Sequence, residues 1–481
     1  MEAKEKISKL LDQRKEMLAD CCDKIWEYAE IRFDTRQSSD ILCKILEDEG
    51  FKLKRGLAHM ENAFTATYGS GKPVIGILAE FDALGNMSQA ANTTQKQPLS
   101  EEKAGHGCGH NVLGTGSIAG AIGIKSYMEE TGLSGTIKVF GCPAEESGYG
   151  KAFMAREGIF NNTDACLTWH PGDCTMVWDS NTLAVAQLYF HFEGIPAHAA
   201  AMPELGRSAL DAAELMNVGV NFLREHIVDS ARIHYAFTDA GGTSANVVQP
   251  TASLYYFVRA QKNDQVLELC KRVEKIAEGA AMMTGTKLHV EWDSACSGYI
   301  PNNTLNNILY KNMLLFTPIQ LDEKNLTYEK ALCDTRSEQM KGAHRSRLSR
   351  MFPELSPKEI EAIFNEPIIT RPFPFMESTG IPSPGMGSTD VGDVSWIAPT
   401  GQILLACEPQ GVPPHSWQWV ANGTSEAVHQ GLLAAGKILA ASAYDLLTNP
   451  NYLRLAKEEH TKDLDGKHYR SIIPEHVHPK Q

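Results

Sequence analysis

Apolar residues recur along the first 180 residues with two different spacings, and segments of the two kinds alternate. Spacings of three and four positions predict helices at 6–30, 38–51 and 114–132. Short continuous apolar runs predict strands at 62–69, 73–82, 136–143 and 165–171. The alternation indicates an α/β fold with a mostly parallel sheet, whose ligands bind at the carboxyl ends of the strands.

The order of the elements changes from Leu183 onward. Strands are predicted at 184–194, 232–242, 251–260 and 287–295, and helices at 206–227 and 264–283. The order β-α-β-β-α-β predicts a ferredoxin-like sandwich. Strand-like and helical segments resume after Ser297, so we interpret 184–298 as a domain inserted between two parts of the first, 1–183 and 299–481.

The last third of the chain contains two further patterns. Residues 317–370 are charged and helix-prone, and we expect them to form a helical excursion on the surface. Residues 425–447 are predicted to form a long helix. The tail after Asn449 is polar, so we expect it to be loosely held.

Composition narrows the range of partners. A chain of 481 residues is long enough for two or three domains, and its formal charge of −14 argues against nucleic acid or an anionic membrane. No hydrophobic run approaches the roughly 20 residues that span a bilayer, and the charged N-terminal segment lacks the apolar stretch of a signal peptide. Eleven cysteines without framework spacing favour a reducing compartment, so we predict the cytoplasm.

The sequence AGHGCGHN at 104–111 places His106, Cys108 and His110 at every second position. Three interpretations fit it: a metal site, a strained nucleophilic turn, or a glycine-rich phosphate-binding loop. The phosphate interpretation lacks the Lys and Ser or Thr of a P-loop. In an extended segment, residues two apart point the same way, so Cys108 and His110 can reach one ion or two neighbouring ions. A glycine-rich turn with a buried free cysteine is the simplest non-functional alternative.

Other candidate ligands follow the predicted strands at the same edge of the sheet. Glu80 and Asp82 end one strand, Glu145 and Glu146 follow another, and His170 ends a third. A proline-rich turn in the returning half adds His415. One cysteine, three histidines and one glutamate exceed the ligands of a tetrahedral zinc and suffice for two ions. Glu146 can then ligate while Glu145 takes a proton from water.

These segments resemble the M20 metallopeptidases over nearly the whole chain. The resemblance is carried by GKPVIGILAEFDAL, GHGCGHNVLGT, GCPAEE, LTWHP, HFEGIPAHAA, GRSALDA, NVVQ, STDVGDVSW and HSWQ. It is strongest to the amidohydrolase branch whose first metal motif is Cys-Gly-His, and within it to the aminobenzoyl-glutamate utilization subgroup. It implies a dinuclear metallopeptidase domain with an inserted dimerisation or lid domain.

The resemblance also implies roles at the metal site. The implied ligands are Cys108, His110, Glu146, His170 and His415. Glu145 matches the general base, and Asp82 matches the aspartate that orients a ligand side chain. Much of the wider family has a histidine ligand where this chain has Glu80. The resemblance implies two divalent ions. Thiolate and imidazole donors suit Zn²⁺, but the branch is associated with Mn²⁺, so we expect Mn²⁺ in preference to Zn²⁺.

In the inserted domain the resemblance assigns three further residues. His198 matches a histidine that stabilises the oxyanion in the active site of the partner subunit. Asn246 and Arg259 match groups that bind the terminal carboxylate of the substrate. Judged from the residues alone, Asn246 could cap a turn and Arg259 could be a surface strand residue. The expected partner is a second copy or a related subunit, giving a homodimer or a heterodimer.

Four conspicuous residues receive no catalytic role. His106 has no ligand counterpart, and we expect it either to support a metal-ligating side chain or to make a hydrogen bond within the loop. Asp390 and Asp393 are expected to order an acidic loop near the site. Cys142 should be a packed strand residue, because a nucleophilic cysteine needs a base nearby.

The implied reaction is cleavage of p-aminobenzoyl-glutamate, a folate breakdown product and an N-acyl-glutamate, to p-aminobenzoate and glutamate. A metal-bridging water would be deprotonated by Glu145 and attack the amide carbonyl. One alternative is a broader N-acyl-amino-acid or dipeptide hydrolase, because the acyl pocket cannot be identified from motifs. An alternative of another class is a non-catalytic partner subunit of a heteromeric hydrolase.

Overall fold

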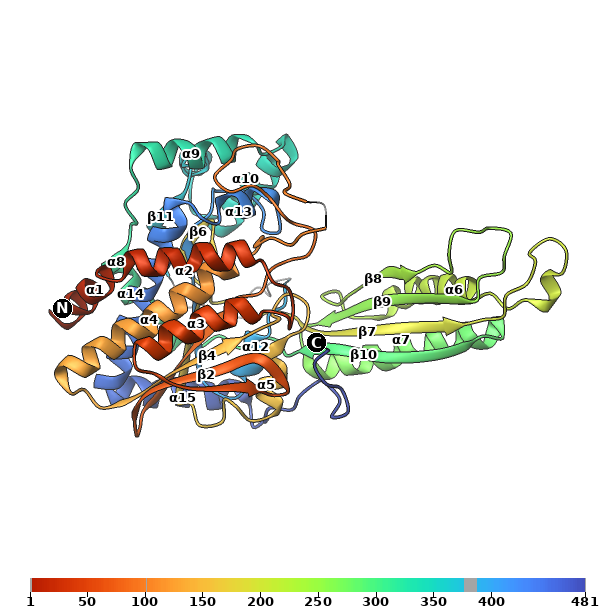
Figure 1. Ribbon diagram of the computed structural model, residues 1–481, viewed down its shortest axis with the longest axis horizontal. Coiled ribbons are helices and arrows are strands. Elements are labelled where there is room, and N and C mark those ends of the chain that lie inside the picture. Colours follow the sequence, from red (N-terminus) through yellow and green to blue (C-terminus); the bar gives the residue numbers. More distant parts are fainter. Residues whose placement is uncertain (1, 101, 376–386, 481) are drawn as a thin grey trace.

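The protein consists of a large α/β domain from which a smaller domain projects, as the computed structural model in Figure 1 shows. The structure describes residues 2–100, 102–375 and 387–480. The large domain is built on an eight-stranded sheet of order β1-β2-β4-β3-β5-β12-β6-β11. Its strands are β1 (Lys52–Leu57), β2 (Met60–Ser70), β3 (Val74–Glu80), β4 (Gly135–Cys142), β5 (Ala165–Gly172), β6 (Cys174–Val177), β11 (Ile369–Pro372) and β12 (Thr400–Ala406).

The central strands β4, β3, β5 and β12 run parallel to one another. Antiparallel pairs attach β1, β2 and β6 on either side, so the sheet is mixed with a parallel centre. This confirms the predicted α/β class. Because the four central strands are parallel, their carboxyl ends lie at one edge.

Alternate residues of the central strands enter two different cores. Ile75 and Ile77 of β3 face one cluster, and Leu78 faces the other. The first cluster lies under α1 (Glu2–Asp12), α2 (Lys15–Tyr28), α3 (Arg36–Asp48), α4 (His110–Thr131), α8 (Asn303–Phe316), α14 (Glu426–Thr448) and α15 (Pro450–Leu464). The second contains α5 (Gly150–Arg156) and α12 (Val391–Ser395) and continues into the small domain.

Small residues let the two central helices approach closely. A Cβ at Gly120 of α4 would lie 2.8 Å from the Leu439 Cβ, and one at Gly436 of α14 would lie 2.7 Å from the Ala119 Cβ. Both separations are too short for real carbon atoms, so glycine is required at this crossing.

The predicted ferredoxin-like domain is confirmed. Its antiparallel sheet has the order β10-β7-β9-β8. The strands are β7 (Ala184–Glu193), β8 (Arg232–Asp239), β9 (Thr251–Ala260) and β10 (Lys287–Cys296), and the helices are α6 (Ala209–Leu223) and α7 (Asn263–Thr284). Figure 1 shows β7 running outward from the large domain, with α6 and α7 packed along the sheet. β8 is an edge strand.

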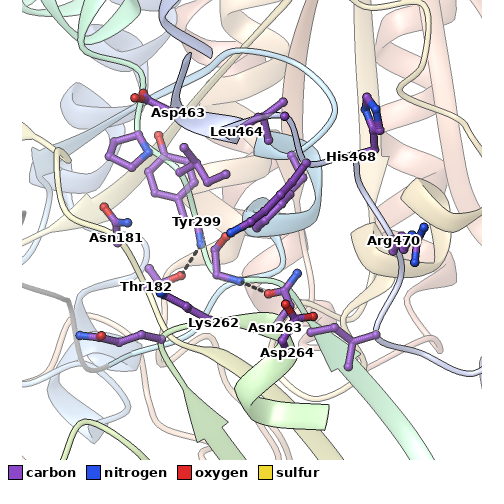
Figure 2. Close-up of a pocket in the computed structure, with 18 of the residues that line it drawn as sticks. Asn181, Thr182, Lys262, Asn263, Asp264, Tyr299, Asp463, Leu464, His468 and Arg470 are labelled. Atoms are coloured by element: carbon purple, nitrogen blue, oxygen red, sulfur yellow. Dashed lines mark hydrogen bonds between the residues drawn. The ribbon is translucent and has the colours of Figure 1, made fainter. Parts of the chain in front are cut away.

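Two connectors and the C-terminal segment surround a cavity of about 1080 Å³ at the domain junction (Figure 2). The Thr182 hydroxyl of one connector accepts a hydrogen bond from the Tyr299 N–H of the other at 3.0 Å. Asn263 accepts another from the Gly298 N–H at 3.3 Å. The side chains of Lys262 and Arg470 also line this cavity.

The helical excursion predicted at 317–370 contains α9 (Glu323–Asp334), α10 (Glu338–Met351) and α11 (Pro357–Phe364). Short α13 (Trp417–Asn422) follows the loop after β12. Among the described residues, no helix combines the length and apolar character needed to cross a membrane.

Two sequence-based predictions are wrong. The single helix at 6–30 is two helices, separated at Arg14, whose guanidinium pairs with Glu49 after α3. The tail after Asn449 is not loose: α15 continues the fold, and Ile472 and Ile473 are buried beyond it. Because only a few apolar residues anchor this tail, its polar composition did not indicate that it packs against the rest of the protein.

Glu329 of α9 makes the stability of the protein depend on pH. Its side chain is fully buried, both carboxyl oxygens lack hydrogen-bond partners among the described residues, and burial raises its pKa to about 8. Between pH 4.5 and 8 the folded protein therefore retains a proton that the unfolded chain releases. Stability contributed by this proton is present below pH 4.5 and is lost as pH rises to 8.

We expect Glu329→Gln to raise the free energy of unfolding by about 4 kcal/mol at pH 8. The gain should shrink toward zero as the pH falls to 4.5. Denaturant unfolding at several pH values measures the effect, with exposed Glu354→Gln as the control. A gain that did not depend on pH would contradict the assignment.

Candidate metal centre and active site

The candidate ligands gather at the carboxyl edge of the parallel strands. Asp82 lies just beyond β3, Glu145 and Glu146 beyond β4, His170 near the end of β5, and His415 beyond β12. Cys108 and His110 join them from the start of α4. The prediction that separate strand ends converge here therefore agrees with the arrangement of the chain.

Two residues with positive φ, Gly109 and His415, set the path of the backbone around the Cys-Gly-His segment. Gly109 has φ +73°, and a Cβ there would lie 2.8 Å from Pro171, so glycine is required where the chain turns into α4. His415 also has a positive φ of 59°, a conformation that costs free energy for a residue with a Cβ. Its N–H donates to the Gly107 carbonyl at 2.8 Å, which holds the two loops together.

Three overlapping groups of side chains offer ligand atoms within 4.8 Å of one another. They are Cys108, His110 and His170; Cys108, Glu146 and His415; and Glu80, His110 and Glu145. The Cys108 Sγ lies 3.6 Å from the His170 Nε2, and the His415 Nε2 lies 3.5 Å from a Glu146 oxygen. All five ligands implied by the sequence occur in these groups.

Asp82 organises two members of the site. One carboxylate oxygen lies 3.2 Å from the His110 Nδ1, and the other accepts the Glu146 N–H at 3.0 Å. The His110 Nε2 therefore faces the cluster, buried and without a hydrogen-bond partner in the described part of the chain. The His170 Nδ1 lies 2.7 Å from the Pro171 carbonyl, so its Nε2 also faces the cluster.

These donors fit divalent cations. A Glu146 oxygen is buried without a hydrogen-bond partner among the described residues, like the His110 Nε2. Burial and the nearby Glu146 carboxylate raise the pKa of the Cys108 thiol, an effect that a bound cation opposes. Thiolate, imidazole and carboxylate groups converging from separate loops are suitable ligands for a divalent transition metal.

The two adjacent glutamates have different surroundings. Burial acts to raise the pKa of Glu146, but contacts with His415 and His110 lower it to about 2. Burial and the Glu80, Glu146 and Asp390 carboxyls raise the pKa of Glu145 well above its ordinary value. Glu145 has no side-chain hydrogen bond within the described ranges, so its carboxyl is available to a substrate.

A buried ion-pair network beneath these groups was missed by the sequence analysis. Lys151 of α5 is fully buried, and its ammonium lies 2.7 Å from Glu80 and 2.6 Å from Asp390. Lysine is ordinarily exposed, so the only sequence signal was its proximity to Glu145 and Glu146. Asp393 accepts hydrogen bonds from Ser297 and thereby orders the neighbouring loop.

His106 and Cys142 lie outside the candidate ligand groups. The His106 Nε2 lies 3.0 Å from the Ile25 carbonyl, and burial lowers the pKa of this histidine to about 3. Cys142 is buried in β4. Both side chains are therefore packed inside the large domain, and neither is a candidate metal ligand.

The structure separates the residues expected in the small domain. Arg259 lies at the inner end of β9, where it pairs with Val185 and donates to the Ser388 hydroxyl at 2.7 Å. His198 and Asn246 flank the outer end, where Glu193 pairs with Thr251. Both are exposed, and the Asn246 carbonyl accepts the Ala199 N–H at 3.0 Å. Within one chain, His198 and Asn246 are not brought to Arg259.

Comparisons with known proteins agree with this architecture. Residues 184–282 match the family described as the peptidase dimerisation domain of M20 proteins. Solved structures similar to the chain include a dinuclear metal-binding peptidase of the M20 family from Bacillus subtilis, with a TM-score of 0.51 and 16% identity, covering 89% of this chain and 99% of that one. The aminobenzoyl-glutamate utilization protein of Klebsiella pneumoniae has a TM-score of 0.58 and 15% identity, covering 90% and 98%.

The chain belongs to the M20 family of metal-dependent peptidases and amidohydrolases, which hydrolyse amide bonds. It is 40% identical to one subunit of the p-aminobenzoyl-glutamate hydrolase of Escherichia coli over 98% of both chains. A second, different subunit of the same hydrolase is 27% identical over 52% of this chain and 60% of its own.

Metal-free protein should gain thermal stability when Mn²⁺ or Zn²⁺ is added, because the ion binds the folded chain. A hundredfold excess over the Kd corresponds to about 2.7 kcal/mol. Cys108→Ala and His170→Ala should each remove most of this gain, and Cys174→Ala, in β6 outside the groups, should keep it. Melting curves with and without the ion measure the gain; an unchanged gain in Cys108→Ala would exclude the thiolate as a ligand.

Proposed function

We propose that the chain is the catalytic subunit of a hydrolase that cleaves p-aminobenzoyl-glutamate to p-aminobenzoate and glutamate. The proposal rests on full-length similarity to a p-aminobenzoyl-glutamate hydrolase chain, found together with a complete set of candidate metal ligands. Beside these ligands, the Glu145 carboxyl has no hydrogen-bond partner among the described residues. A non-catalytic subunit would have no requirement for this set. The proposed location is the cytoplasm.

The proposed cofactor is a pair of divalent ions, Mn²⁺ before Zn²⁺, held by five side chains: Cys108, His110, Glu146, His170 and His415. The similarity to the Bacillus subtilis protein, a dinuclear metal-binding peptidase, supports two ions rather than one. When bound, such ions lower the pKa of water and polarise the amide carbonyl.

Glu145 is the proposed general base. Its carboxyl lies 3.9 Å from the His110 Nε2, at the edge of the ligand cluster, and its side chain is 12% exposed. It takes a proton from the attacking water and delivers it to the leaving nitrogen, so one residue acts first as base and then as acid. Asp82 keeps the His110 ring and the Glu146 backbone in place during these steps.

Arg259 is proposed to bind the glutamate carboxylate of the substrate, because its guanidinium Nε is buried without a partner in the described part of the chain. His198 and Asn246 would complete the site from the partner subunit, with His198 stabilising the oxyanion. Their exposed position at the outer end of the small domain supports a role across an interface between subunits.

The small domain provides a surface for such pairing. β8 is an edge strand, and Leu215, Val218 and Phe222 form an exposed apolar stripe on α6, with Phe222 74% exposed. Edge strands and apolar stripes are suited to association. The partner is a second copy of this chain or a chain related to the second subunit of the Escherichia coli hydrolase.

Glu145→Gln should retain the metal and lower kcat for p-aminobenzoyl-glutamate by about 10³-fold, because the proton acceptor is lost. Release of p-aminobenzoate measures turnover, and elemental analysis measures the metal. Glu157→Gln, after α5, is the control. Normal turnover by Glu145→Gln would disprove the mechanism.

Mixing inactive Glu145→Gln with inactive His198→Ala should restore activity if His198 serves the site of the partner subunit. Random reassociation as a homodimer gives about a quarter of the wild-type activity, because one site is intact in each mixed dimer. Turnover after dissociation and remixing tests this. No recovery among demonstrated mixed dimers would contradict sharing of His198.

A further inference from the structure

A fully buried lysine separates two carboxylates at the floor of the candidate metal centre. The Lys151 Nζ lies 2.7 Å from the Glu80 Oε1 and 2.6 Å from the Asp390 Oδ1. The Lys151 backbone N–H donates to the Asp390 Oδ2 at 2.8 Å. Removing an ammonium from water costs several kcal/mol unless it is paired. The two carboxylates together offset the cost of burying this ammonium.

Glu80 also faces the metal-binding groups. Its Oε2 lies 3.4 Å from the His110 Nε2, and Glu80, His110 and Glu145 offer atoms within 4.8 Å of one another. A free carboxylate at this position could bind a cation through one or both oxygens. The contact with Lys151 occupies one oxygen and compensates the charge of Glu80, which weakens it as a ligand.

We propose that Lys151 is a positioning residue that holds Glu80 as a paired carboxylate and keeps it out of the coordination of a bound cation. The two ions proposed above are then left to the thiolate, the imidazoles and Glu146, with an open position for substrate. Glu145 remains the carboxyl that is free to exchange protons. This inference rests on the divalent metal centre proposed above, but it does not depend on the identity of the substrate.

Asp390 forms the second ion pair of Lys151. It precedes α12, so the lysine links the ends of β3, α5 and α12. Replacing Lys151 alone would leave two buried carboxylates unpaired and threaten folding. The double variant Lys151→Met/Asp390→Asn instead removes one charge of each sign and leaves Glu80 unpaired, which makes it the informative variant.

Co²⁺ substitution reports the coordination number directly, because four-coordinate Co²⁺ absorbs visible light several times more strongly than five- or six-coordinate Co²⁺. We expect Lys151→Met/Asp390→Asn to lose up to about half of the visible absorption of the wild-type protein loaded with two Co²⁺ ions, because Glu80 becomes a ligand of one of them. Adding Glu80→Gln should restore the wild-type spectrum. Lys151→Arg, which keeps the charge, and Lys125→Met, which removes another largely buried lysine, should both resemble the wild type.

Glu80→Gln alone supplies a test that leaves Lys151 in place. Its Co²⁺ spectrum should match the wild type, because the proposal excludes Glu80 from the coordination. With the native metal, the double variant should show a kcat lowered about 10- to 100-fold, with KM changed less than about threefold.

Three outcomes would overturn the inference: a changed spectrum in Glu80→Gln, an unchanged spectrum in the folded double variant, or failure of Glu80→Gln to reverse it. Failure of the wild type to bind Co²⁺ would overturn the metal centre and this inference together. Expected spectra without turnover of p-aminobenzoyl-glutamate would overturn only the proposed substrate.

Discussion

Mutual repulsion among buried carboxylates is the constraint on which the arrangement of the site depends. Glu80, Asp82, Glu145, Glu146 and Asp390 converge at one edge of the sheet, where charge is poorly screened. Glu80 and Asp390 are compensated by an ammonium, Asp82 by an imidazole and a backbone N–H, and Glu146 by imidazoles, whereas Glu145 has no hydrogen-bond partner among the described residues. Because these partners come from separate strands and helices, the site exists only when the whole large domain is folded.

The parallel centre of the sheet and the inserted domain position different parts of the proposed site. Parallel strands bring residues far apart in the sequence to one edge, as with Asp82 and His415. The inserted domain is attached so that Arg259 lies at its base, where it donates to the Ser388 hydroxyl, while His198 is exposed near the outer end of the small domain. One polypeptide thus keeps Arg259 beside the large domain and leaves His198 exposed at the far end of the small domain.

Periodicity and spacing predicted the α/β class, the ferredoxin-like order and the convergence of the ligand-bearing loops, because these follow from local patterns. They did not predict the break at Arg14, whose guanidinium pairs with Glu49, a residue distant in sequence. The buried position of Lys151 was also missed, since its two partners lie 71 residues before and 239 residues after it. Long-range charge pairing leaves no periodic signal in one sequence.

The cavity at the domain junction has a mechanical consequence. The two connectors meet there through a few polar contacts, such as that between Thr182 and Tyr299, around about 1080 Å³ of space. The hydrophobic core beside this space continues from the large domain into the small one, so a rotation of the small domain would disrupt packed side chains as well as change the shape of the cavity. The orientation of the two domains is therefore coupled to the stability of both, and a substitution in the shared core would weaken the orientation and the fold together.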